Sequence, residues 1–146
     1  METVELSIVI NKPTEEVFTY LANLENDLKW RREWVEAKNT SESPLGLGTT
    51  FLLVGELLGR RMETVYETIE YEPNRMSAWK AVSGPLPLTF RRTFERIDGG
   101  TRVTMRYEAE VRGFFKLVKP LVMSIGKRQL EGDFPKLKEL MEGHAM

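Results

Sequence analysis

The sequence contains no cysteine and a single histidine, His144, which lies close to the carboxyl end of the 146 residues. The absence of cysteine excludes a disulfide scaffold, a thiol nucleophile and a zinc site with thiolate ligands. A histidine in a terminal segment that we expect to fray is a poor general base. No Ser/His/Asp triad can therefore be assembled, and no catalytic residue is assigned.

The sequence also lacks an excess of charge of one sign, a long apolar run and a phosphate-binding loop. Its 21 basic and 22 acidic side chains give a formal net charge of −1, which does not indicate a nucleic-acid partner. No run of about 18 uncharged apolar residues predicts a membrane span. The first residues do not resemble a secretion signal, so we expect a cytoplasmic protein. No motif predicts a metal or a cofactor.

The residues that are present indicate one globular domain, residues 1–146, of the α+β class. Hydrophobic residues make up 41% of the chain and charged residues 29%, which is typical of a folded domain. Residues 2–10 alternate between apolar and polar side chains, as in a strand with one buried face. A helix is predicted after Pro13, with a break near residues 23–27. Further strands are predicted at 34–39, 49–58, 61–71, 75–82, 89–97 and 101–111.

The last two strands form a hairpin whose register can be read from the sequence. A two-residue turn at Asp98–Gly99 pairs the strands residue by residue. The predicted pairs on one face are Phe94 with Val103, Arg92 with Met105, Phe90 with Tyr107 and Leu88 with Ala109. This face is apolar and the opposite face is charged, so a slip of one residue would mix the two sets. Tight turns between successive strands favour an antiparallel sheet, which tends to curl.

Arg92 is the exception on the apolar face of this hairpin, between Phe90 and Phe94. An unpaired buried guanidinium is strongly destabilising, so Arg92 requires a partner. One interpretation is an internal salt bridge, for which Glu63 or Glu67 is the candidate carboxylate. The other is a polar anchor for a ligand inside a cavity. Both remain open from the sequence.

Residues 114–140 predict a long amphipathic helix that covers the apolar side of the sheet. Pro120 predicts a kink, while Gly126, Gly132 and Pro135 weaken the helix further. The space between sheet and helix is either filled by side chains or left open as a cavity. The large inward-facing side chains of the last hairpin predict that any cavity is modest. The three tryptophans are expected in the core, although Trp30 is also a candidate for a cavity mouth, and the pattern does not settle which face Trp79 occupies.

Four stretches carry a resemblance to a known family. They are VINKPTEEVFTYLANLEN followed by Trp30, YEPNRMSAW, TFERIDGGTRVTMRYE and RQLEGDFPKLKEL. Together they resemble the START-related, Bet v 1-like (SRPBCC) superfamily, in particular its polyketide cyclase/dehydrase-like branch of small bacterial proteins. The resemblance implies a helix-grip fold, in which a curved seven-stranded antiparallel sheet wraps around a long C-terminal helix, with two short helices after the first strand. Gly132 and Pro135 depart from the smooth closing helix of the family, which calls the continuity of this helix into question.

Many members of this superfamily bind apolar small molecules between sheet and helix. We therefore expect a binding protein for an apolar or amphipathic small molecule, such as a lipid, a polyketide or an isoprenoid-like compound, acting as a monomer or homodimer. The candidate ligand-binding residues are Arg92, Phe90, Phe94, Met105, Tyr107, Trp30, Trp79, Tyr66 and Leu121. One alternative is a cyclase or dehydrase acting in the same cavity, and a second is a protein-interaction module of the chaperone-activator type.

Overall fold

The computed structural model describes residues 2–41, 44–57, 59–84, 87–109 and 119–143. In this part of the chain the sheet has seven antiparallel strands in the order β1-β7-β6-β5-β4-β3-β2. The strands are β1 (Glu2–Ile10), β2 (Trp34–Asn39), β3 (Thr50–Leu57), β4 (Arg60–Glu72), β5 (Met76–Ser83), β6 (Leu88–Ile97) and β7 (Gly100–Ala109). The helices are α1 (Thr14–Leu21), the 3-10 helix η1 (Leu24–Lys29) and α3 (Lys119–Glu142). The predicted helix-grip arrangement is thereby confirmed.

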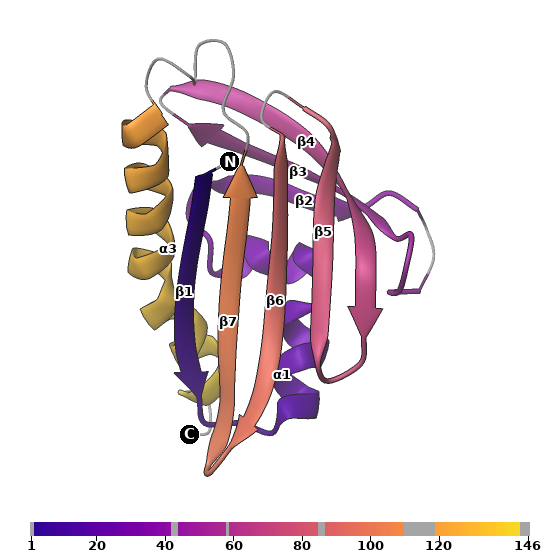
Figure 1. Ribbon diagram of the computed structural model, residues 1–146, viewed down its shortest axis with the longest axis vertical. Coiled ribbons are helices and arrows are strands. Elements are labelled where there is room, and N and C mark those ends of the chain that lie inside the picture. The colour runs from indigo at the N-terminus through magenta and orange to yellow at the C-terminus, as the bar shows by residue number, and fades with distance from the viewer. Residues whose placement is uncertain (1, 42–43, 58, 85–86, 110–118, 144–146) are drawn as a thin grey trace.

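The sheet curls strongly along its length. Figure 1 shows β1, β7 and β6 running side by side, while β2 and β3 cross behind them at a steep angle. The pairing of β4 with β5 and of β2 with β3 contains register shifts, such as the one between Thr68 and Glu70. Irregularities of this kind bend strands and increase their twist. The curvature gives the sheet an inner face on which η1, α1 and α3 are placed.

The β6–β7 hairpin has the register that the sequence predicts. Phe90 pairs with Tyr107, and Arg92 pairs with Met105. Gly99 closes the turn with φ of 81°, a left-handed conformation that suits glycine. Six of the eight residues predicted to face the core are buried, and Leu88 and Tyr107 are half-buried.

The core consists of two clusters of buried side chains. The first joins α1 and α3 to the sheet and includes Ile10, Val17, Phe18, Leu21, Trp30, Phe94, Val103, Met105, Leu130 and Leu137. The second lies under the strands β3 to β6 and includes Leu24, Phe51, Leu53, Tyr66, Trp79 and Phe90. Trp79 is fully buried and stacks on Phe90 with ring centroids 4.9 Å apart. The sequence left open which face of the sheet Trp79 occupies. The structure places its side chain on the buried face, in the interior.

Helix α3 is continuous from Lys119 to Glu142, so the expected weakness at Gly132 and Pro135 does not interrupt it. Leu130 and Leu137 are buried on either side of that segment and hold the helix in place. The last turn is tied to β1 through Lys138, which donates to the carbonyl of Val9 at 2.7 Å. Tertiary contacts therefore outweigh the low helix propensity of these residues.

Some of the predictions about this helix concern residues beyond the described ones. The predicted helix start at Phe114 and the side chains of Pro120 and Leu121 lie outside the described part of the chain. His144 lies outside it as well. Among the helices that are described, none has the length and apolar character needed to cross a membrane.

Candidate functional site

A cavity of about 140 Å³ lies between the inner face of the sheet and α3. This space is enough for on the order of ten water molecules. Its walls come from β1, β2, β3, β4, β6, β7 and α3, together with η1 and the segment that follows it. The apolar part of the wall includes Leu53, Tyr66, Phe90, Tyr107, Ala109 and Leu130. The sequence left open whether this space is filled or open; the structure has a cavity here, and it is modest in size.

Arg31 is the central polar group of the cavity wall. Its side chain is only 7% exposed and lies between η1 and β2. Nε donates to Oδ2 of Asp133 on α3 at 3.2 Å, and Nη1 donates to the hydroxyl of Tyr107 on β7 at 3.2 Å. Nη2 donates to Glu33. One guanidinium thus connects the segment after η1 with the last strand and the last helix.

Burial and neighbouring charges have opposing effects on the pKa values of the ionisable groups around Arg31. Burial raises the pKa of the Glu33 carboxyl, and the attraction of Arg31 only partly offsets this. Burial acts to lower the pKa of Arg31, but Tyr107 and the surrounding carboxylates raise it overall. Burial also raises the pKa of the Tyr66 phenol. The polar end of the cavity therefore offers a guanidinium already engaged in hydrogen bonds, a carboxyl group and phenols.

Trp34 is the first residue of β2, and its indole lies against β3 in the wall of the cavity. Gly55, which pairs with Trp34 across the two strands, leaves the space for this ring. A Cβ atom at Gly55 would lie 2.6 Å from Cε3 of Trp34 and 2.8 Å from the carbonyl oxygen of Glu33. Glycine inside a strand commonly marks such a close approach.

We expect the substitution Gly55→Ala to destabilise the fold by about 1–3 kcal/mol, because the added methyl overpacks the space occupied by Trp34. Urea unfolding measures this change. The matched control is Gly46→Ala, since a Cβ at Gly46 has no neighbour within 4 Å. Equal stability of the two variants would contradict the packing of Trp34 on Gly55.

Arg92 forms an internal ion pair, the first of the two interpretations of this residue. It is fully buried, and its Nη2 lies 2.6 Å from Oδ2 of Asp27 on η1. Nη1 donates to Oδ1 of Asp27 at 3.0 Å and to the carbonyl of Leu21 at 2.9 Å. The guanidinium carbon also lies 5.5 Å from the ring centroid of Trp79, within cation–π range. Burial acts to lower the pKa of Arg92, but Asp27 raises it overall.

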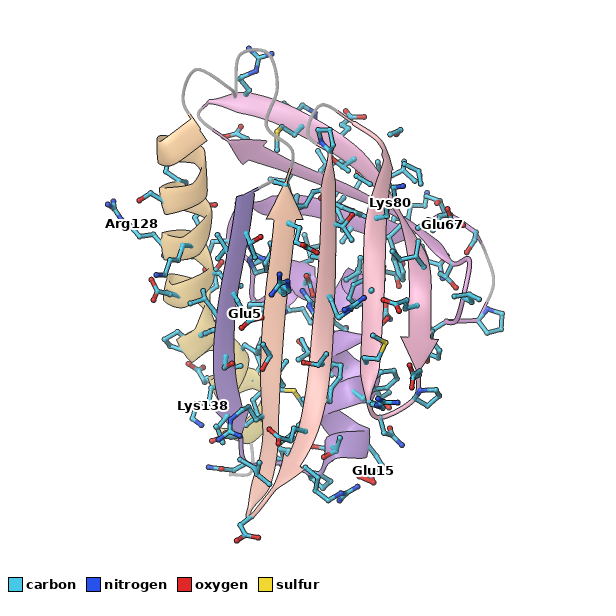
Figure 2. All side chains as sticks on the ribbon, viewed as in Figure 1. Glu5, Glu15, Glu67, Lys80, Arg128 and Lys138 are labelled. Atoms are coloured by element: carbon cyan, nitrogen blue, oxygen red, sulfur yellow. The ribbon has the colours of Figure 1, made fainter. Side chains whose placement is uncertain are left out.

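The predicted partners of Arg92 are wrong. Glu63 is exposed and pairs with Arg61 on its own strand. Glu67 lies opposite Lys80 on the neighbouring strand, and both are visible in Figure 2. The carboxylate comes instead from η1, the second of the two short helices that the family resemblance implied after the first strand.

The cavity brings together three of the predicted site residues, namely Tyr66, Phe90 and Tyr107. The predicted residues Arg92, Phe94, Met105, Trp30 and Trp79 are buried but are not among the described residues that line it. Sequence reasoning did not identify Arg31 and Glu33, and it placed Trp34 in the core. The available signal was the segment WRREW, in which charged side chains stand between two tryptophans directly before a strand.

The arrangement is suited to binding through hydrogen bonds at one end and apolar contact along the rest. The Phe90 and Tyr107 rings stack with centroids 5.3 Å apart, and Tyr66 meets Phe90 edge to face. Among the described residues, no group of three or more His, Cys, Asp or Glu side chains is placed to hold a metal ion.

Comparison with solved structures shows the same fold over the whole chain. TTHA0849 from Thermus thermophilus is 19% identical with a TM-score of 0.84, covering 99% of this chain and 100% of that chain. The ZhuI aromatase/cyclase from Streptomyces sp. R1128 is 12% identical with a TM-score of 0.77, covering 99% and 96%. A START superfamily protein from Mycobacterium smegmatis is 14% identical with a TM-score of 0.74, covering 97% of each chain.

No curated protein was found to match the chain. The family model described as polyketide cyclase / dehydrase and lipid transport matches residues 1–142. This match and the structural neighbours agree with the resemblance to the SRPBCC superfamily. The chain belongs to the polyketide cyclase / dehydrase and lipid transport family.

Proposed function

We propose that the protein binds an apolar or amphipathic small molecule, of the lipid, polyketide or isoprenoid-like class, in the cavity between the sheet and α3. The observation that carries this proposal is a cavity of about 140 Å³ with a mainly apolar wall and polar groups clustered around Arg31. Pockets of this composition bind small molecules by burying apolar surface and orient them with a few polar contacts. The family description, which includes lipid transport, supports the same reading.

The contacts within this proposal differ from those that the sequence indicated. We assign direct contact to Tyr66, Phe90 and Tyr107, which line the cavity. Arg92 is assigned a supporting role, because its ion pair with Asp27 holds η1 against the sheet. Trp30 and Trp79 are also assigned a supporting role. Each ring lies within about 5.6 Å of the Arg92 guanidinium carbon, where a cation–π interaction helps to hold Arg92 in place.

Native mass spectrometry of freshly purified protein tests this proposal. We expect a bound species of a few hundred daltons that disappears after denaturing extraction, with chemical analysis of the extract giving its class. A protein that carries no such species, and whose melting temperature does not rise with any member of a panel of lipids, polyketides and isoprenoids, would contradict the proposal.

An enzymatic role is the second candidate. It is favoured by the family description and by Glu33, a carboxyl group at the cavity whose pKa burial raises. A raised pKa makes such a group a better proton acceptor than an ordinary carboxylate. Incubation of the protein with a poly-ketone substrate would then yield a cyclised or dehydrated product. The same incubation with a Glu33→Gln variant would yield none if Glu33 moves the proton.

The interaction-module alternative predicts a filled core and an exposed apolar patch. The cavity favours ligand binding over this alternative.

A cytoplasmic location stays a prediction.

A further inference from the structure

The wall of the cavity contains two polar atoms that lack partners and are complementary in kind. Oε1 of Glu33 and Nε1 of Trp34 are both buried and have no hydrogen-bond partner among the described residues. The two residues are adjacent in the chain, and both line the cavity. Buried polar groups are almost always paired, and leaving one unpaired destabilises the protein. Because both residues line the cavity, a group on a bound ligand is the candidate partner for these two atoms.

We infer that the ligand carries a hydroxyl group, which donates to Glu33 and accepts from Trp34. This inference rests on the proposed function and specifies the polar end of the ligand. A hydroxyl group has one donor and two acceptor positions, so it satisfies a carboxylate and an indole N–H together. A carboxylate ligand only accepts hydrogen bonds and an ammonium ligand only donates them, so each leaves one of the two atoms unpaired.

The distribution of charge around the cavity also disfavours an anionic ligand. Among the described residues, the lining includes the acidic side chains Asp27, Glu33 and Glu56 and the basic side chain Arg31. Arg31 is already shared between Glu33, Asp133 and Tyr107. Arg92, the cation that the sequence indicated as an anchor for an anion, is paired with Asp27. A ligand carboxylate would therefore meet an unpaired carboxylate oxygen without a free guanidinium to compensate, whereas a neutral hydroxyl meets no such repulsion.

Matched naphthalene derivatives test this inference, because they share one apolar body and differ only in the polar group. Isothermal titration calorimetry compares 2-naphthol, 2-naphthoate, 2-(aminomethyl)naphthalene and 2-methylnaphthalene at neutral pH. We expect 2-naphthol to bind at least about tenfold more tightly than each of the other three, as expected for a site that hydrogen-bonds a hydroxyl group. Tighter binding of 2-naphthoate or of the amine would overturn the inference.

Two variants assign the preference to the two residues. Trp34→Phe keeps an aromatic ring but removes the N–H group, and Glu33→Gln replaces the charged acceptor. In each variant we expect the advantage of 2-naphthol over 2-methylnaphthalene to fall below about threefold, because one hydrogen bond is lost or weakened. The comparison with 2-methylnaphthalene separates this effect from any change in apolar contact, because both compounds meet the same altered wall. Glu33→Gln also disturbs the pairing with Arg31, so circular dichroism must show that it folds, and Trp34→Phe serves as the test if it does not.

Glu70→Gln is the control, because it makes the same chemical change as Glu33→Gln at an exposed residue on the outer face of the sheet. It should retain the full preference for 2-naphthol. If Glu70→Gln loses the preference and Trp34→Phe keeps it, the assignment is wrong. Equal binding of 2-naphthol and 2-methylnaphthalene would overturn the inference and leave the proposed function intact. Failure of all four compounds to bind, in a protein that also carries no bound species in native mass spectrometry, would overturn both.

Discussion

The substitution Asp27→Ala is expected to lower the free energy of unfolding by about 3–5 kcal/mol, because it leaves the Arg92 guanidinium charged and unpaired in the interior. The Asp27 and Arg92 side chains are 2% and 0% exposed, so water cannot replace the lost carboxylate. Arg92 is always protonated, which means that it cannot escape the penalty by losing its charge. Folded domains are stable by only about 5–15 kcal/mol, so this variant is expected near the limit of folding.

Urea denaturation of the wild type and the variant measures this effect. The control is a substitution at Glu70, the partner of Arg91, which is the residue next to Arg92. Arg91 pairs with Glu70 on the outer face, where their side chains are 46% and 42% exposed. Glu70→Ala is therefore expected to change the stability by at most about 1 kcal/mol. The double substitution Asp27→Leu with Arg92→Met should recover most of the loss, since removing both charges avoids the unpaired one. Equal stability of Asp27→Ala and Glu70→Ala would show that the buried pair is not formed.

The strands of this protein were predictable because their information is local. The β6–β7 hairpin is an example, since its turn and the alternation on its two faces together allow one register, which the structure has. A shift of one residue would have placed Arg91 and Glu95 in the core. Bounds moved by only a few residues, as in β4, which was predicted at 61–71 and spans Arg60–Glu72.

The partners of the buried charges were not predictable because they depend on contacts between distant segments. Arg92 and Asp27 are 65 positions apart, and Arg31 and Asp133 are 102 positions apart. The two predicted partners of Arg92, Glu63 and Glu67, lie on β4, which β5 separates from β6, whereas the carboxylate comes from the 3-10 helix η1. The sequence predicted that Arg92 needs a partner, but periodicity cannot say which acidic residue reaches it.

The same argument explains the partial prediction of the cavity lining. Alternation along β6 and β7 shows which side chains face inward, and Phe90 and Tyr107 do line the cavity. Phe94 faces the same side but packs against Phe18 of α1, with ring centroids 5.1 Å apart. Position along the strand therefore decides between core and cavity, through the placement of α1 and α3 on the sheet. That placement is a property of tertiary packing and has no local signal.

The substitution Gly126→Leu is expected to abolish ligand uptake while leaving the protein folded, with affinity for any cavity ligand reduced by at least about a hundredfold. Gly126 lies in α3 and lines the cavity, and a Cβ atom at this position would have no neighbour within 4 Å. A leucine side chain can therefore extend into the open space and occupy volume that a ligand needs. Glycine within a helix is less favourable than alanine by about 1 kcal/mol, so replacing it should also stabilise α3.

Gly126→Ala separates these two effects, because it supplies the same gain in helix propensity but little volume. We expect both variants to melt at or above the temperature of the ligand-free wild type, and only Gly126→Leu to lose the bound species in native mass spectrometry. If Gly126→Leu retains that species, the ligand lies elsewhere, and the cavity between the sheet and α3 is not the binding site. If Gly126→Leu binds no ligand because it has lost stability, its thermal unfolding curve will show this loss by comparison with the curve of Gly126→Ala. A stable Gly126→Leu protein without ligand, beside a ligand-bound Gly126→Ala protein, would place the ligand in this cavity.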